Sequence, residues 1–290
     1  MLIHDTTARV RDFYEHTPFP NYDELETPAE LVAKAKRGTL ASLLDRDIPF
    51  RVRVLDMGCG TGQLPLFLSL ASRNVVGADL SRASLRLGEQ FRCRNGLTRV
   101  HFVQCDLFRP PFPASSFDYV ISTGVLHHTA DPARALAAVA ALVKPGGYIV
   151  AGFYNAYARL PLKARGIILR MTGGRFSWID PVLRKFAVSS DKRTSWYRDQ
   201  YEHPAEMSVS LDTVLKWFRE TGLTYVATVP SIGNRSRDAD LFAASAAGSR
   251  VSRWLRQIGW AFTIGREGGL FVVIGRKEYA DARSVAEVMR

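Results

Sequence analysis

The sequence predicts an α/β fold, a doubly wound and mostly parallel sheet of seven strands with helices on both faces. Three observations carry this prediction. Short apolar strands alternate with helical segments between residues 51 and 153, a glycine-rich turn follows the first strand, and a helix and two strands resume the pattern near the C-terminus. Parallel strands require crossover connections, which helices normally provide, so this alternation indicates a sheet covered on both sides.

The apolar runs fix where each core element is expected. The expected strands are residues 51–56, 74–79, 100–105, 117–122, 148–153, 223–229 and 270–276. Helices are expected at 64–71, 81–95, 131–144 and 211–221. Ser81 is suited to be the N-cap of its helix, because its hydroxyl can accept a hydrogen bond from the first turn.

Three segments precede or interrupt this core, and they set the expected domain boundaries. Residues 1–45 form an N-terminal helical extension, with one helix around Val10 and a second from the Thr27–Pro28 start to about Asp45. The expected divisions are then a core at 46–153, a basic aromatic insertion at 154–208, the rest of the core at 209–278 with a second insertion near 231–262, and a tail at 279–290.

Composition excludes several classes of protein. The 290 residues are 47% hydrophobic and 23% charged, which excludes wholesale disorder. No apolar run approaches the roughly 18 residues that cross a bilayer, and residues 1–15 lack the apolar stretch of a secretory signal. The three cysteines are odd in number and have no CxxC spacing, so we expect neither a disulfide scaffold nor a metal site, and a reducing cytoplasmic location.

Positive charge is concentrated in one segment. The net charge is +11, and residues 159–198 hold ten Lys and Arg against two Asp, which gives that window +8. Such an excess points to an anionic substrate, a nucleic acid or an acidic membrane surface, and the plain alternative is a solvated basic face.

The glycine-rich turn after the first strand is the most informative motif. Gly58, Gly60 and Gly62 allow a tight turn and a close approach of the backbone to a ligand. Gln63 stands where the dinucleotide fingerprint needs a third small residue, and the turn has no lysine for a P-loop. Asp56, two residues before the first glycine, would repel a pyrophosphate but attract an ammonium group, which favours S-adenosylmethionine over NAD.

With these motifs the sequence resembles the class I S-adenosylmethionine-dependent methyltransferases across residues 53–153. The match includes the acidic residue and G-x-G-x-G at 56–62, the acid Asp79 at the end of the second strand, Asp106 after the third, and residues 117–128 and 142–147 around the fourth and fifth. The resemblance implies a Rossmann-like methyltransferase sheet whose last strand is antiparallel. It also implies that Asp79 binds the ribose hydroxyls and Asp106 the adenine amino group.

The resemblance further implies a set of residues that bind S-adenosylmethionine. They belong to the N-terminal extension, the glycine turn and the strand ends: Tyr14, Asp56, Gly58, Cys59, Gly60, Gly62, Asp79, Leu80, Asp106, Leu107, Thr123 and Gly124. Phe13, Tyr14 and the aromatic turn at 18–22 could present ring faces to the sulfonium, or could fasten the extension to the core.

Five residues are candidates for orienting or deprotonating the acceptor. His127 and His128 follow the fourth strand, where each could be a base or a pocket wall. Tyr154, Tyr201 and His203 belong to the insertion. The polar stretch at 199–206 either faces the acceptor or forms a hydrogen-bonded latch that holds the insertion in place.

The predicted function is in-line methyl transfer to a small, anionic or amphiphilic molecule. RNA methylation is an alternative. It is disfavoured because no N/D-P-P-Y/F motif follows the fourth strand, whereas enzymes that methylate amino groups of nucleic acids typically have this motif there. A cofactor-binding protein without methyl transfer is a further alternative. Residues 160–171 are amphipathic and basic, so they could rest on an anionic membrane or cap the pocket. No sequence feature indicates an oligomeric state.

Overall fold

The computed structural model describes residues 2–16, 27–173, 175, 177–185, 197, 201, 206–233 and 239–279. None of the described helices has both the length and the apolar character needed to span a bilayer.

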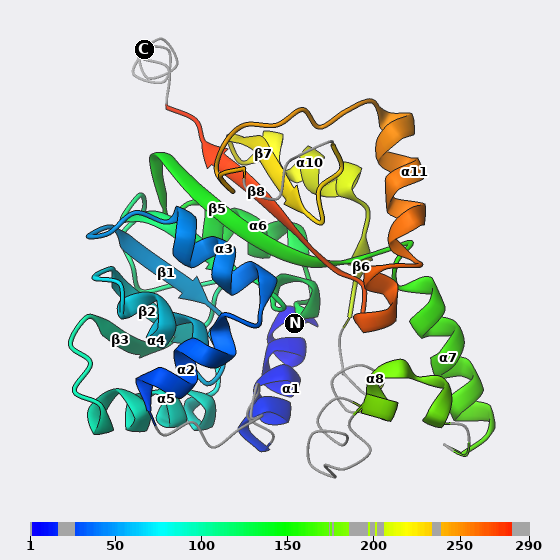
Figure 1. Ribbon diagram of the computed structural model, residues 1–290, viewed down its shortest axis with the longest axis horizontal. Coiled ribbons are helices and arrows are strands. Elements are labelled where there is room, and N and C mark those ends of the chain that lie inside the picture. Colours follow the sequence, from blue (N-terminus) through cyan, green and yellow to red (C-terminus); the bar gives the residue numbers. More distant parts are fainter. Residues whose placement is uncertain are drawn as a thin grey trace.

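A single mixed sheet forms the centre of the molecule (Figure 1). Its strands are β1 (Arg53–Met57), β2 (Asn74–Asp79), β3 (Val100–Gln104), β4 (Phe117–Ser122), β5 (Val143–Asn155), β6 (Ser208–Val209), β7 (Leu223–Val229) and β8 (Leu270–Lys277). The order is β3-β2-β1-β4-β5-β8-β7, and β8 runs antiparallel to both of its neighbours. The predicted fold class is therefore confirmed.

Two strands differ most from the sequence-based prediction, while β1, β3 and β8 differ from it by one or two residues at their ends. β6 is a two-residue strand that pairs parallel with the end of β5, and no periodicity can reveal so short a strand. β5 begins at Val143 rather than Tyr148 because Val143 pairs with Phe117 across a register shift. The preceding helix consequently ends at Ala140 rather than Lys144.

Helices cover both faces of the sheet. They are α1 (Leu2–His16), α2 (Pro28–Ala35), α3 (Thr39–Asp47), α4 (Gln63–Ser69), α5 (Arg82–Arg94), α6 (Pro132–Ala140), α7 (Leu160–Met171), α8 (Pro181–Lys185), α10 (Leu211–Glu220) and α11 (Arg250–Trp260). Short 3₁₀ turns lie at η1 (Leu126–His128), η2 (Ser177–Ile179) and η3 (Ile264–Glu267).

The single helix expected from Thr27 to about Asp45 is two helices. Thr27 and Glu30 form the capping box that begins α2. The chain leaves the helical conformation at Gly38, which is extended and begins α3. The hydroxyl of Ser42 donates to the carbonyl of Lys36 at 3.2 Å, so a side chain satisfies one backbone group released at this break.

The core has two layers because side chains alternate along each strand. Val54 packs with Leu44 of α3 and Phe67 of α4 on one face, whereas Leu55 packs with Leu136 of α6 on the other. Burial on both faces leaves the carboxyl ends of β1, β2 and β4 as the polar edge of the sheet. In open α/β folds ligands bind at this edge.

Candidate functional site

The turn after β1 depends on glycine. Gly58 and Gly62 have φ of 81° and 76°, a left-handed conformation that other residues rarely adopt. A Cβ on Gly58 would lie 2.2 Å from the side chain of Val125, and one on Gly62 would lie 2.5 Å from the ring of Phe102. The turn therefore brings its backbone against the loop that follows β4 on one side and against β3 on the other.

Asp79 at the end of β2 holds this turn in place. Its Oδ2 accepts a hydrogen bond from the backbone N–H of Gly60 at 2.8 Å, and its Oδ1 accepts one from the N–H of Ser81 at 2.8 Å. Burial raises the pKa of Asp79, and these backbone hydrogen bonds oppose that rise. One carboxylate thus links the glycine turn to the start of α5.

Asp56 lies in β1, and only 4% of its surface is exposed. Burial, with a smaller contribution from the neighbouring charge of Asp79, raises the pKa of Asp56 to about 7. Within the described part of the chain no cationic side chain pairs with it. A ligand that brings a positive charge would therefore favour the ionised carboxylate.

Helix α1 is fastened to the amino end of α5. The Oε1 of Glu15 accepts from the N–H of Arg82 at 2.5 Å, and its Oε2 accepts from the N–H of Ala83 at 3.3 Å. The hydroxyl of Ser81 donates to the carbonyl of Tyr14 at 3.3 Å. A carboxylate at a helix amino end satisfies unpaired N–H groups and complements the helix dipole, so α1 has a defined place beside the polar edge of the sheet.

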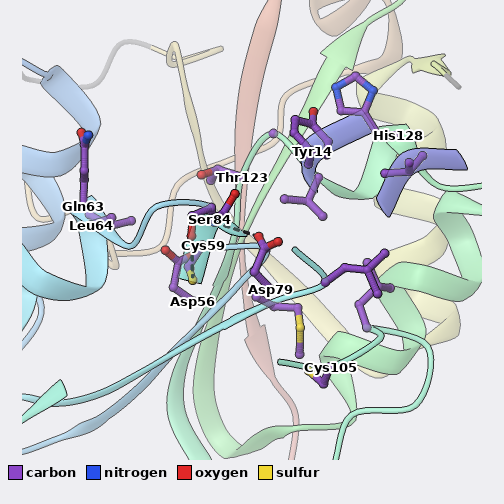
Figure 2. A pocket seen from close by; sticks show the side chains of 18 of the residues that line it. Tyr14, Asp56, Cys59, Gln63, Leu64, Asp79, Ser84, Cys105, Thr123 and His128 are labelled. Carbon is purple, nitrogen blue, oxygen red and sulfur yellow. Dashed lines mark hydrogen bonds between the residues drawn. The ribbon is translucent and has the colours of Figure 1, made fainter. Parts of the chain in front are cut away.

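These elements enclose a cavity of about 460 Å³, within the range of small-molecule sites (Figure 2). The structure brings most of the predicted cofactor residues to its wall, namely Tyr14, Asp56, Gly58, Cys59, Gly60, Asp79, Leu80, Asp106, Leu107, Thr123 and Gly124. Gly62 does not line the cavity and instead begins α4. Asp106 also organises its own loop, since its Oδ1 accepts from the N–H of Phe108 at 2.9 Å.

Sequence reasoning missed many of the other residues that line the cavity. The additional lining residues come mainly from α1 to α5 and the strand ends: Thr6, Thr7, Val10, Leu31, Lys34, Ala35, Gly38, Ala41, Met57, Gln63, Leu64, Phe67, Ser84, Cys105, Phe108, Val125 and Thr129. Most side chains that α1 to α4 contribute are apolar, and Lys34 adds a cation whose ammonium nitrogen is buried. The capping box at Thr27 predicted α2, but no local signal relates that helix to the cavity.

The two consecutive histidines have different surroundings. His128 lines the cavity near Tyr14, across from Gln63 and Leu64 in Figure 2. His127 is fully buried away from the cavity, with its ring centroid 3.9 Å from that of Tyr154 and its Nδ1 3.4 Å from the carbonyl oxygen of Gly152. The 3₁₀ turn η1 points neighbouring residues in different directions.

Residues of the insertion that were candidates for acceptor contact pair with one another. The guanidinium of Arg159 stacks 3.7 Å from the ring of Tyr154 and forms a two-point ion pair with Glu206, its Nε donating to Oε1 at 2.8 Å. The hydroxyl of Tyr201 donates to Oδ2 of Asp180 at 2.5 Å, and burial raises the pKa of Tyr201. Neither Tyr154 nor Tyr201 lines the cavity, and His203 is outside the described residues.

Comparison with known proteins identifies the core. The methyltransferase domain family matches residues 55–151. The chain is 28% identical to the ubiquinone biosynthesis O-methyltransferase of Leptothrix cholodnii, over 59% of this chain and 64% of that protein. It is 29% identical to the demethylmenaquinone methyltransferase of Clavibacter sepedonicus, over 60% of this chain and 66% of that protein. An uncharacterised protein of a Synechococcus strain is 28% identical, over 61% of this chain and 48% of that protein. The chain thus spans about half to two thirds of the length of these relatives.

Solved structures share the fold. PKMT2 from Rickettsia typhi, determined in complex with AdoHcy, superposes with a TM-score of 0.57 at 14% identity, covering 83% of this chain and 52% of that one. The [4+2]-cyclase SpnF superposes with a TM-score of 0.54 at 16% identity, covering 94% and 97%. The family match, the strand order and the acidic strand ends agree, and S-adenosylmethionine is the cofactor of this family. Residues 55–151 therefore form a class I S-adenosylmethionine-dependent methyltransferase domain.

Proposed function

We propose that the chain transfers the methyl group of S-adenosylmethionine to a small amphiphilic molecule bound in the same cavity. The observation that carries this proposal is the composition of the cavity wall. Three carboxylates and the glycine turn line the cavity together with apolar side chains and one lysine. A polar charged ligand and an apolar acceptor could therefore share one enclosed space.

The acidic lining residues fit the cofactor in charge and in hydrogen bonding. Asp56 would face the ammonium group of the methionine part, since a cation stabilises its ionised form. Asp79 would accept from the ribose hydroxyls with the lone pairs that the backbone of Gly60 and Ser81 leaves available. The carboxylate oxygen of Asp106 that does not bind Phe108 would accept from the adenine amino group.

The apolar lining residues support an acceptor with an apolar body and one acidic hydroxyl. Val10, Leu31 and Phe67 offer contact surface, and the positive charge of Lys34 would attract a phenolate or carboxylate. Relatives named ubiquinone biosynthesis O-methyltransferase and demethylmenaquinone methyltransferase are consistent with a quinone-like acceptor. We therefore propose a hydroxylated aromatic or quinone-like acceptor.

Few catalytic groups are needed for this reaction. S-adenosylmethionine, when bound, supplies a methyl group on a positively charged sulfur that departs as a neutral thioether. The protein's part is to align the acceptor oxygen with the methyl carbon, exclude water beneath α1, and receive the hydroxyl proton. His128 is the candidate base, because its ring lines the cavity and an imidazole titrates near neutral pH.

Calorimetric titration with S-adenosylmethionine, combined with turnover assays on hydroxylated quinones and phenols, tests the proposal. We expect binding, formation of S-adenosylhomocysteine and a methylated product. Asp106→Asn should weaken cofactor binding by about tenfold through loss of a hydrogen bond to charge. Asp118→Asn is the matched control, because Asp118 lies in β4 outside the cavity lining and pairs with Lys144.

Each outcome of these assays discriminates between functions. Absence of S-adenosylmethionine binding would refute the proposal. Tight binding without product over a broad acceptor panel would favour a protein that holds the cofactor without transferring methyl groups. Methylation of RNA but of none of the small molecules would show that the acceptor is a nucleic acid.

A further inference from the structure

Helix α7 carries an unusual exposed apolar stripe. Leu160, Ile167, Ile168 and Met171 are all exposed, Met171 to 82%. Their spacing places them on one side of the helix, while Leu162 and Leu169 are buried on the other. A helix that only covers the core would present polar residues to water at these positions.

Helix α11 repeats this pattern. Val251, Trp254 and Leu255 are exposed on one side, and Phe262 just beyond the helix is exposed to 73%. Gln257 and Trp260 are buried on the other side. Two separate helices therefore share the same arrangement.

The two helices lie along the same edge of the molecule, to the right in Figure 1. The 3₁₀ turn η3 follows α11 closely and contacts α7, where the guanidinium of Arg165 donates to the carbonyl of Gly265 at 3.0 Å. Of the fourteen large apolar side chains that are exposed in the described part of the chain, nine belong to residues 160–178 and 251–262. Apolar exposure is thus concentrated at this edge, which we call the α7/α11 edge.

The charges carried by helices α7 and α11 themselves have one sign, and the first acid after α11 is Glu267 in η3. Exposed cations flank both stripes, namely Lys163, Arg170, Arg175, Arg250 and Arg256. Residues 249–265 contain no acid, and Asp180 is the only acid in residues 159–185. Asp180 is itself fully buried and bonded to Tyr201, so it does not offset the surface charge.

We propose that the α7/α11 edge docks on the surface of an anionic lipid bilayer. Leucine, isoleucine, methionine and tryptophan side chains would enter the headgroup region, and the flanking cations would lie against lipid phosphates. A nucleic acid would use the cations but leave the aliphatic stripes exposed to water, whereas a bilayer accommodates both. The edge lies outside the cavity lining, so this docking does not depend on the methyl transfer proposed above.

Co-sedimentation of the full chain with vesicles tests the docking. We expect binding to mixed phosphatidylcholine and phosphatidylglycerol vesicles at low salt, weaker binding at high salt, and little binding to phosphatidylcholine alone. Met171→Asp and Trp254→Ser should each weaken binding about tenfold, and Lys163→Gln with Arg170→Gln should weaken it by about fivefold per cation.

Leu87→Asp is the matched control, because Leu87 is an exposed leucine on α5 outside the α7/α11 edge. It should sediment like the wild type, and circular dichroism should give all variants the same folded spectrum. Absence of vesicle binding at low salt would overturn the proposal, and so would equal loss in Leu87→Asp. Lipid-free dimerisation abolished by Met171→Asp, with no vesicle binding, would assign the edge to a second copy of the chain.

Discussion

The strand ends around the glycine turn and the insertion between β5 and β6 both contain many polar and aromatic residues, yet they use them differently. Around the turn, Asp56, Asp79 and Asp106 line a cavity. In the insertion, Arg159 pairs with Glu206, and Tyr201 bonds to Asp180. The comparison teaches that a cluster of titratable residues marks a site only when the backbone leads their side chains into a shared space.

The largest effect is expected at Asp79, which belongs to the first region. Asp79→Ala removes the acceptor for the Gly60 and Ser81 N–H groups and for the ribose hydroxyls. We expect cofactor affinity to fall by at least about 100-fold, because hydrogen bonds to a charged group are lost and the turn loses its brace. Calorimetric titration measures this loss, and an affinity within threefold of wild type would place the ribose elsewhere.

The two adjacent histidines allow a cavity-lining residue to be compared directly with a buried packing residue. His128→Gln should lower kcat by roughly 100-fold if the imidazole removes the acceptor proton. His127→Gln should leave kcat nearly unchanged and reduce the melting temperature, because His127 packs against Tyr154 away from the cavity. Steady-state kinetics and thermal melts on both variants measure these effects. A larger loss of kcat in His127→Gln than in His128→Gln would make His127 the candidate base instead.

Asp56 should link cofactor binding to pH. The pKa of Asp56 is raised from 3.8 to about 7. Between these two pH values the carboxyl of Asp56 is therefore protonated in the folded, cofactor-free protein and ionised in the unfolded chain. The stability contributed by this group is fully present below pH 3.8 and is lost as pH rises from there through about 7. Cofactor affinity should rise over the same range, because the ionised carboxylate attracts the ammonium group.

Asp56→Asn separates these two effects. It should weaken cofactor binding by about tenfold at pH 8, through loss of a charge contact, and raise the melting temperature of the cofactor-free protein by a few degrees. Titrations and melts at pH 6 and pH 8 provide the measurement. If the melting temperature of Asp56→Asn at pH 8 were lower than that of the wild type, Asp56 could not be a buried charge that destabilises the cofactor-free protein.

The smallest effect on binding is expected in the second region. Glu206→Gln and Tyr201→Phe should change cofactor affinity less than about twofold, since neither residue lines the cavity. Glu206→Gln should nevertheless lower the melting temperature by several degrees, because Arg159 is fully buried and would lose its charge partner. A large rise in KM for the acceptor in Tyr201→Phe would instead bring the insertion into the site.

The same contrast explains what the sequence could predict. The limits of β2, β4 and β7 follow from apolar runs bounded by turn residues, and Ser81 was identifiable as a cap. The glycine turn and its acids are close in sequence to the strands that position them, so their convergence on one edge could be anticipated.

Other features depend on contacts between distant segments. The approach of α2 to the cavity, the pairing of Arg159 with Glu206 and the two-residue strand β6 have no local signature. The two histidines show the same limit at short range. Which of them faces the cavity depends on the turn geometry of η1, and adjacent identical residues give no pattern from which to infer it.

The attachment of α1 has a consequence for which substitutions the chain can tolerate. Glu15 binds the backbone amides of Arg82 and Ala83, and backbone amides are present whatever side chains stand there. Positions 82 and 83 can therefore accept many other residues, apart from proline, without loosening the amino-terminal helix. Position 15 has no such freedom, because only a carboxylate of the right length reaches both amides with two oxygens.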